Sequence, residues 1–288
     1  MKSLDGYMRN NFMIIDFHTH SFPEEIAARA IAKLSGPSHM DPYTDGTRSG
    51  LLQSMKEGGI GLSVLMPVAT SPRQTTSINR IAIETNEQSD KTGLASFGAV
   101  HPDNTDYRIQ LRTLAENGIK GIKLHPVFHQ IYFDDIRYMR IVDCAAENNL
   151  AVTIHGGYDI GFPGQDFVTP EHILPVIKEV GHKKLIAAHM GGWSCWNEAE
   201  QLLACTDIYL DTSFSLMELY YHSGKRIEHL SNEKFCRIVR HHGADKILFG
   251  SDSPWVSQKA SVEAIRESGL NENEVKLILE DNAKALLK

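Results

Sequence analysis

Eight short apolar segments recur along the chain, and each is followed by a stretch with helical character. Near-continuous apolar runs of this length are typical of strands buried on both faces of a parallel sheet. The expected strands occupy residues 13–20, 62–67, 94–101, 119–126, 150–157, 184–192, 208–212 and 246–252. Between and after them the pattern predicts helices at residues 23–34, 51–57, 74–90, 107–116, 134–148, 170–180, 196–203, 231–242, 257–268 and 272–287.

The alternation of strands and helices predicts an α/β fold of the (β/α)8 TIM-barrel type. Neither a composition break nor a low-complexity linker divides the sequence, so we expect one domain over residues 1–288 with two C-terminal helices. A doubly wound open sheet is the alternative, but it gives the polar residues at the strand ends no reason to converge. In a barrel, the carboxyl ends of all strands meet at one face and line one pocket. The turn-rich residues 35–48 predict a long loop at this face, either a lid or an ordinary solvated loop.

Histidine is the informative residue type, because six of the 14 histidines lie at predicted strand ends: His18, His20, His101, His125, His155 and His189. Strands occupy only about a fifth of an ordinary chain, so this clustering indicates a site. His18 and His20 share one face of the first strand, ~7 Å apart. Asp16 has the same parity one step deeper, where it is expected to orient a histidine.

Two further strands contribute Lys123 and Asp252. His18, His20, His155 and Asp252 together offer three imidazole nitrogens and one carboxylate, the kind of ligand set that catalytic zinc sites use while keeping a position for water. A bound metal lowers the pKa of its water from ~15.7 toward ~7, and Asp252 is then the expected general base.

The remaining candidates have two interpretations each. His101 and His125 are either polar contacts for a substrate or hydrogen-bonded structural histidines. Trp255, with Trp193 and Trp196, either forms an apolar wall for a planar substrate or packs within the loops.

Five motifs in order at strand ends resemble the amidohydrolase superfamily, and specifically the amidohydrolase-related branch that includes aminocarboxymuconate-semialdehyde decarboxylase. They are Asp16-x-His18-x-His20, Gly121-Ile-Lys-Leu-His-Pro126, His155-Gly, His189-x-Gly-Gly192 and Gly250-Ser-Asp252. The resemblance spans residues 13–288 and implies a distorted TIM barrel with one or two divalent metals. It also implies either hydrolysis or non-oxidative decarboxylation.

By this resemblance, His18, His20, His155 and Asp252 are the ligands of a single-metal member, and His189 contacts substrate or water. Lys123 has three alternatives: a carbamylated bridge between two metals, a lysine paired with Asp or Glu, or a ligand for a substrate carboxylate. Two of these need only one metal, so we expect a mononuclear site. Zinc is the first expectation, manganese and iron(II) fit the same ligands, and a second metal requires carbamylated Lys123.

Composition narrows the class of partner. Net charge is −7 with scattered Lys and Arg, which argues against nucleic acid or an anionic membrane as a partner. The sequence has no apolar run of 18 residues, the first dozen residues lack a signal-peptide pattern, and the four cysteines are widely spaced. We therefore expect a cytoplasmic protein that acts on a small molecule, with a homodimer as the assembly common among such barrels.

Three functions follow from these residues. The first is a metal-dependent hydrolase of a small, carboxylated or cyclic amide, lactone or ester. The second is a metal-dependent decarboxylase of an aromatic or unsaturated acid, which would use the same strand-end residues. The third is a barrel that binds metal without catalysis. The absence of cysteine beside the histidines disfavours the third, because closed structural zinc sites are commonly rich in cysteine.

Overall fold

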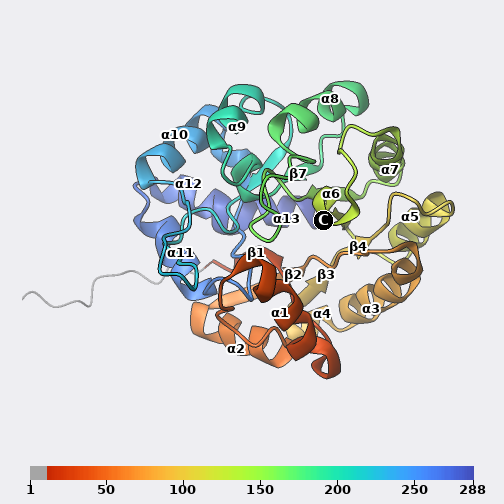
Figure 1. The fold of residues 1–288 in the computed structure, drawn as a ribbon, viewed down its shortest axis with the longest axis horizontal. Coiled ribbons are helices and arrows are strands. Elements are labelled where there is room, and N and C mark those ends of the chain that lie inside the picture. The colour runs from red at the N-terminus through yellow and green to blue at the C-terminus, as the bar shows by residue number, and fades with distance from the viewer. Residues whose placement is uncertain (1–11) are drawn as a thin grey trace, which may run out of the picture.

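Parallel β-strands form the centre of the molecule and α-helices surround them (Figure 1). The computed structural model describes residues 12–288. Hydrogen-bonded neighbours follow chain order, in one ladder from β1 to β3 and another from β4 to β9, and every pair is parallel. The strands are β1 (Ile14–Thr19), β2 (Ile60–Leu65), β3 (Leu94–Ser96), β4 (Gly98–Ala99), β5 (Gly121–Leu124), β6 (Ala151–Ile154), β7 (Leu185–Ala187), β8 (Tyr209–Asp211) and β9 (Ile247–Leu248).

Backbone hydrogen bonds join the two ladders at both of their edges. β3 and β4 are two pieces of the predicted strand at residues 94–101, and the amide of Phe97 between them donates to the carbonyl of Leu65 at 2.9 Å. At the other edge, the amide of Phe17 donates to the carbonyl of Phe249 at 2.7 Å, and that of Asp252 to the carbonyl of His18 at 2.9 Å. The prediction of a (β/α)8 barrel is therefore confirmed, with the chain after β9 lying against β1.

The helices agree with the predicted pattern except near the first and fourth strands. In residues 12–288 they are α1 (Glu24–Ser38), α2 (Arg48–Gly58), α3 (Thr75–Glu87), α4 (Ser89–Thr92), α5 (Tyr107–Glu116), α6 (Pro126–His129), α7 (Ile136–Glu147), α8 (Pro170–Val180), α9 (Trp196–Leu202), α10 (Asn232–His242), α11 (Gln258–Glu267), α12 (Glu272–Lys276) and α13 (Asn282–Leu286). Short 3₁₀ turns lie at Pro72–Gln74, His189–Gly191 and Ala244–Lys246, and a π-helical turn at Leu277–Asp281 joins α12 to α13.

The prediction that the first helix ends at residue 34 is wrong. α1 continues to Ser38 with Pro37 in its last turn, and it ends only at His39, whose left-handed φ of 52° lets its amide reach the carbonyl of Ser35. A proline leaves the carbonyl four residues before it without an amide donor, and in the last turn of a helix that carbonyl lies next to those that have no such donor anyway. The predicted loop is correspondingly shorter. The predicted strand at residues 119–126 is β5, and α6 begins at Pro126, where that strand was expected to end.

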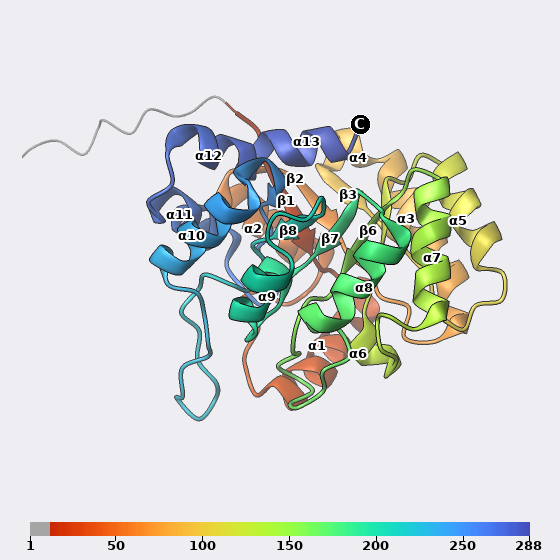
Figure 2. The same ribbon diagram turned by 90° about the horizontal axis from the view of Figure 1, so that it is seen from above.

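The interior of the barrel is filled by apolar side chains, which leaves only one end open for chemistry. Ile15, Phe17, Val64, Phe97 and Ile186 belong to this inner cluster, and Ala283 and Leu286 of α13 pack against it. A second, larger cluster lies between the strands and the outer helices. Figure 2 shows α13 across one end of the barrel, and α1, α6 and the long loop between β8 and α10 at the other.

Candidate active site

The structure places the candidate side chains at the carboxyl ends of five strands. His18 belongs to β1 and His20 follows it, and Lys123 belongs to β5. The remaining residues lie in the segments that come after β5, β6, β7 and β9. His20 is partly exposed, whereas the others are buried: His18, Lys123, His125, His155, His189 and Asp252. The barrel thus brings together residues that are far apart in the sequence, as predicted.

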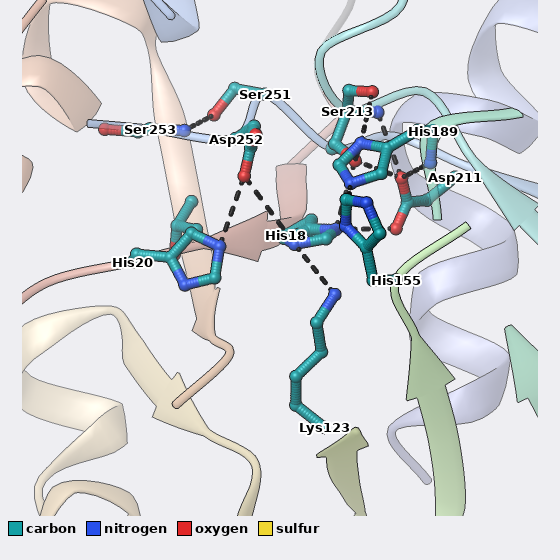
Figure 3. A network of polar contacts seen from close by, with 12 residues as sticks. His18, His20, Lys123, His155, His189, Asp211, Ser213, Ser251, Asp252 and Ser253 are labelled. Atoms are coloured by element: carbon teal, nitrogen blue, oxygen red, sulfur yellow. Dashed lines mark hydrogen bonds and ion pairs between the residues drawn. The ribbon is translucent and has the colours of Figure 1, made fainter. Parts of the chain in front are cut away.

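His18, His20 and Asp252 converge on one point (Figure 3). Asp252 Oδ1 lies 3.2 Å from Nε2 of His20 and 3.7 Å from Nε2 of His18. The other ring nitrogen of His18, Nδ1, lies 2.7 Å from a carboxylate oxygen of Asp211. Because a carboxylate only accepts, Nδ1 carries the proton and Nε2 presents a lone pair to the site.

In His155 and His189, too, an acceptor fixes which ring nitrogen carries the proton. Nε2 of His155 lies 3.0 Å from the carbonyl of Tyr158, and Nδ1 of His189 lies 3.0 Å from the carbonyl of Ser213. Carbonyl oxygens accept hydrogen bonds, so these two nitrogens carry the protons and the other two are lone pairs. The lone-pair nitrogens, His155 Nδ1 and His189 Nε2, face each other at 3.1 Å. Two lone pairs at this distance repel each other unless a positive charge lies between them.

A divalent metal fits these nitrogens and the carboxylate of Asp252, because the imidazoles of His18, His155 and His189 are each held from behind by an acceptor and offer a neutral nitrogen in front. The four predicted ligands do not form one cluster. His18, His20 and Asp252 have ligand atoms within 4.8 Å of one another, whereas Nε2 of His155 groups with His125 and Asp159. Since that Nε2 donates to Tyr158, the nitrogen that His155 offers a cation is Nδ1.

Lys123 lies between these groups. Its Nζ is 3.2 Å from Nε2 of His18, and no carboxylate in residues 12–288 lies within 4.0 Å of it, so the alternative of an Asp- or Glu-paired lysine is not observed. Burial lowers the pKa of Lys123 to about 8, against the charges of Asp211, Asp252 and Asp159, which raise it. The lone pair of His18 Nε2 cannot bind Lys123 and a metal at once, so a metal there requires the amine to move or to change chemically.

Asp211 is the functional residue that the sequence prediction missed. It is fully buried at the end of β8, and its Oδ1 accepts from the amides of His189 at 3.1 Å and Ser213 at 3.0 Å. Burial raises the pKa of Asp211, but its interactions with His18 outweigh that and hold the pKa well below its usual range. One carboxylate therefore orients His18 and the backbone of His189. The available signal was its position as the acidic last residue of a buried strand.

Asp16 and Asp252 connect β1 with the segment that follows β9. Asp16 Oδ1 accepts from the amides of His18 at 3.2 Å and Ser251 at 3.0 Å, and Oδ2 accepts from Nε2 of Gln258 at 2.8 Å. Asp16 thus contacts one of the histidines it was expected to orient, through the backbone amide of His18. Burial raises the pKa of Asp16 to about 6. Asp252 has a left-handed φ of 67°, a conformation that is costly for a residue other than glycine and that aims its carboxylate into the site.

The other candidates surround this centre. His101 packs edge-on against His129, and His125 stacks between Phe128 and His155 with ring centroids 3.8 and 4.4 Å away. The three tryptophans differ in their roles. Trp196 is buried and donates to the carbonyl of His189 at 2.9 Å, Trp193 is buried and donates to the carbonyl of Glu228, and Trp255 is half-buried. Of these, Trp255 is therefore the one whose exposure suits an apolar wall.

The chain belongs to the amidohydrolase family, whose sequence model matches residues 15–288. This confirms the resemblance seen in the motifs, and the protein is accordingly an enzyme of that superfamily. No curated protein sequence gives a significant match.

Solved structures with the same fold are distant in sequence. A TIM-barrel protein from Bordetella bronchiseptica has 17% identity and a TM-score of 0.72, covering 96% of this chain and 98% of that one. A 5-carboxyvanillate decarboxylase from Novosphingobium aromaticivorans, complexed with manganese and 4-hydroxy-3-methoxy-5-nitrobenzoic acid, has 13% identity and a TM-score of 0.70, covering 96% of each chain. A Pseudomonas putida protein assigned as a 2-pyrone-4,6-dicarboxylic acid hydrolase has 18% identity and a TM-score of 0.65, covering 96% and 97%. No helix in residues 12–288 is long and apolar enough to cross a membrane.

Proposed function

We propose that this enzyme is a metal-dependent hydrolase of a small amide, lactone or ester. The observation that carries the proposal is the convergence of His18 Nε2, His20 Nε2 and the Asp252 carboxylate, with the far nitrogen of His18 held by Asp211. A divalent metal bound there supplies a nucleophile at neutral pH and stabilises the negative charge that develops on the substrate oxygen.

The protein's own groups then have distinct roles. Asp252 takes the proton of the attacking water and returns it to the leaving group. His189 directs Nε2 toward Nδ1 of His155, and its ring is fixed by the carbonyl of Ser213. The buried position of these groups excludes bulk water, which strengthens each electrostatic interaction.

Zinc is the metal we propose, because neutral imidazoles and one carboxylate suit it; manganese, present in the decarboxylase neighbour, and iron(II) fit the same donors. We propose one ion per chain at His18, His20 and Asp252. Carbamylated Lys123 would instead provide a bridge toward His155 and His189, where a second ion fits. Metal analysis of the purified protein distinguishes the two: a content near two ions per chain contradicts the mononuclear proposal.

A non-oxidative decarboxylase is the second candidate, since decarboxylases are among the proteins with this fold. In that reaction Asp252 or His189 would protonate the carbon that loses carbon dioxide. Products formed in ¹⁸O-labelled water separate the two functions. Hydrolysis places the label in the product and releases no carbon dioxide, whereas release of carbon dioxide without label in the product refutes the hydrolase proposal.

A further inference from the structure

Asp159, on the loop after β6, has a carboxylate oxygen whose nearest partner is the imidazole of His125. Its Oδ1 accepts from the amide of Gly161 at 2.7 Å. Its Oδ2 faces Nε2 of His125 at 3.4 Å and Nε2 of His155 at 4.0 Å, but within residues 12–288 it receives no hydrogen bond. The proton on His155 Nε2 goes to the carbonyl of Tyr158. The side chain is 13% exposed, so Asp159 is nearly buried but still reaches solvent.

Asp159 lies beside the candidate active site, on the far side of His155. His155 separates the two, with Nε2 on the side of Asp159 and Nδ1 against His189. Phe128 stacks on His125 and lies 5.5 Å from Phe162, which gives this side of the site an aromatic wall. A substrate that reaches from the metal ligands past His155 would therefore place an apolar portion on this wall and a polar group at Asp159.

The charges around Asp159 indicate which polar group of a substrate would bind there. Lys123 is the only buried lysine or arginine in residues 12–288, whereas Asp159, Asp211 and Asp252 are all shielded from solvent. Recognition of a dicarboxylate needs several fixed cations, ideally arginines that bind carboxylates in a bidentate way. A divalent metal at His18, His20 and Asp252 would balance these carboxylates together with Lys123. No lysine or arginine of residues 12–288 lies within 4.0 Å of Asp159 itself, so this end of the site suits a neutral or cationic group.

We propose that Asp159 recognises a hydrogen-bond donor, and best a protonated amine, on the substrate beside the bond that is cleaved. The proposal rests on the proposed function, which locates that bond at His18, His20 and Asp252. It assigns this enzyme a substrate class unlike the dicarboxylate in the name of the Pseudomonas putida neighbour.

Benzohydroxamic acids on the zinc-loaded enzyme test this assignment, because the hydroxamate chelates the metal and the ring carries the probing group. Calorimetry would compare the unsubstituted compound with derivatives bearing aminomethyl or carboxylate in the 3- or 4-position. We expect the better aminomethyl isomer to bind at least about tenfold more tightly than either carboxylate isomer, since like charges at a site disfavour binding strongly. Asp159→Asn keeps an acceptor for Gly161 and should abolish that preference while leaving the unsubstituted compound unaffected.

Asp166→Asn is the matched control, because Asp166 lies on the same loop but is exposed and bonds to Tyr132. It should leave all affinities at the wild-type values. Equal binding of the aminomethyl and carboxylate compounds, or a preference that survives Asp159→Asn, overturns the assignment of Asp159. Failure of the unsubstituted compound to bind refutes the metal site itself, and the assignment falls with it.

Discussion

Replacing Asp211 with asparagine should weaken metal binding without unfolding the protein. The carboxylate of Asp211 accepts the proton of His18 Nδ1 at 2.7 Å and so keeps the Nε2 lone pair directed into the site. Asparagine has the same shape and can still accept one of these hydrogen bonds, but its charge is gone. Its amide group can also face Nδ1, which then becomes the acceptor and moves the proton to Nε2.

The magnitude follows from the geometry. A charge-assisted hydrogen bond contributes about 1.5–3 kcal/mol, and groups that orient metal ligands typically change metal affinity by about 10–100-fold when mutated. Here the affected histidine is one of three side chains in the cluster. We therefore expect the zinc dissociation constant of Asp211→Asn to rise about 10–100-fold, which is about 1.4–2.7 kcal/mol.

Competition with a chromophoric chelator measures this constant for the wild type and the variant. Asp207→Asn is the control, because Asp207 precedes the same strand but is exposed and pairs with Lys183 and Lys246 at 2.9 Å. It should bind zinc like the wild type. If Asp211→Asn has a native circular dichroism spectrum and wild-type zinc affinity, the orienting role of Asp211 is wrong. Ser213→Ala removes a hydroxyl 3.1 Å from the same Nδ1 and should give a smaller loss.

Asp252→Asn should lower turnover about 10²–10⁴-fold, as loss of a general base does, and steady-state kinetics within tenfold of the wild type would contradict its role. Dialysis against a chelator should abolish turnover, zinc or manganese should restore it, and elemental analysis should find about one ion per chain. Tyr138→Phe leaves Nδ1 of His129 without the hydroxyl donor at 2.5 Å, so urea denaturation should show a loss of about 1–3 kcal/mol, with exposed Tyr132→Phe unchanged. Burial holds the pKa of His129 at about 4 in the folded protein, against 6.5 normally, so the unfolded chain binds more protons between these values. The free energy of unfolding should therefore fall as the pH is lowered from 6.5 to about 4. A His129→Asn variant that shows the same slope over that range would contradict this cause.

The strand ends could be predicted from the sequence because a parallel barrel has a simple rule: buried strands are apolar, and the polar residue that ends each one faces the common mouth. His18, Lys123 and His189 follow that rule. Asp211 follows it as well, but a lone aspartate at the end of a short strand resembles any turn residue, and only its 2.7 Å contact with His18 reveals its role.

Asp159 could not be predicted for a different reason. It lies in an irregular loop without periodicity, and the hydrogen bond from Gly161 that orients it depends on local backbone geometry. The separation of His155 from the cluster of His18, His20 and Asp252 could not be predicted either, because sequence spacing does not show which ring nitrogen of His155 donates to a carbonyl.

The closure of the barrel between β1 and the chain after β9 gives the proposed metal ligands a second significance. His18 and His20 lie on or next to the first strand, and Asp252 lies in the segment after the last one. An ion held by all three would therefore cross-link the two edges at which the barrel closes. Such an ion stabilises the closed barrel by about 2.7 kcal/mol when its free concentration is 100 times the dissociation constant. During synthesis this cross-link cannot form until residue 252 has been made and β1 has met the segment after β9, so metal binding follows closure of the barrel. Removing the metal with a chelator should correspondingly destabilise this junction first.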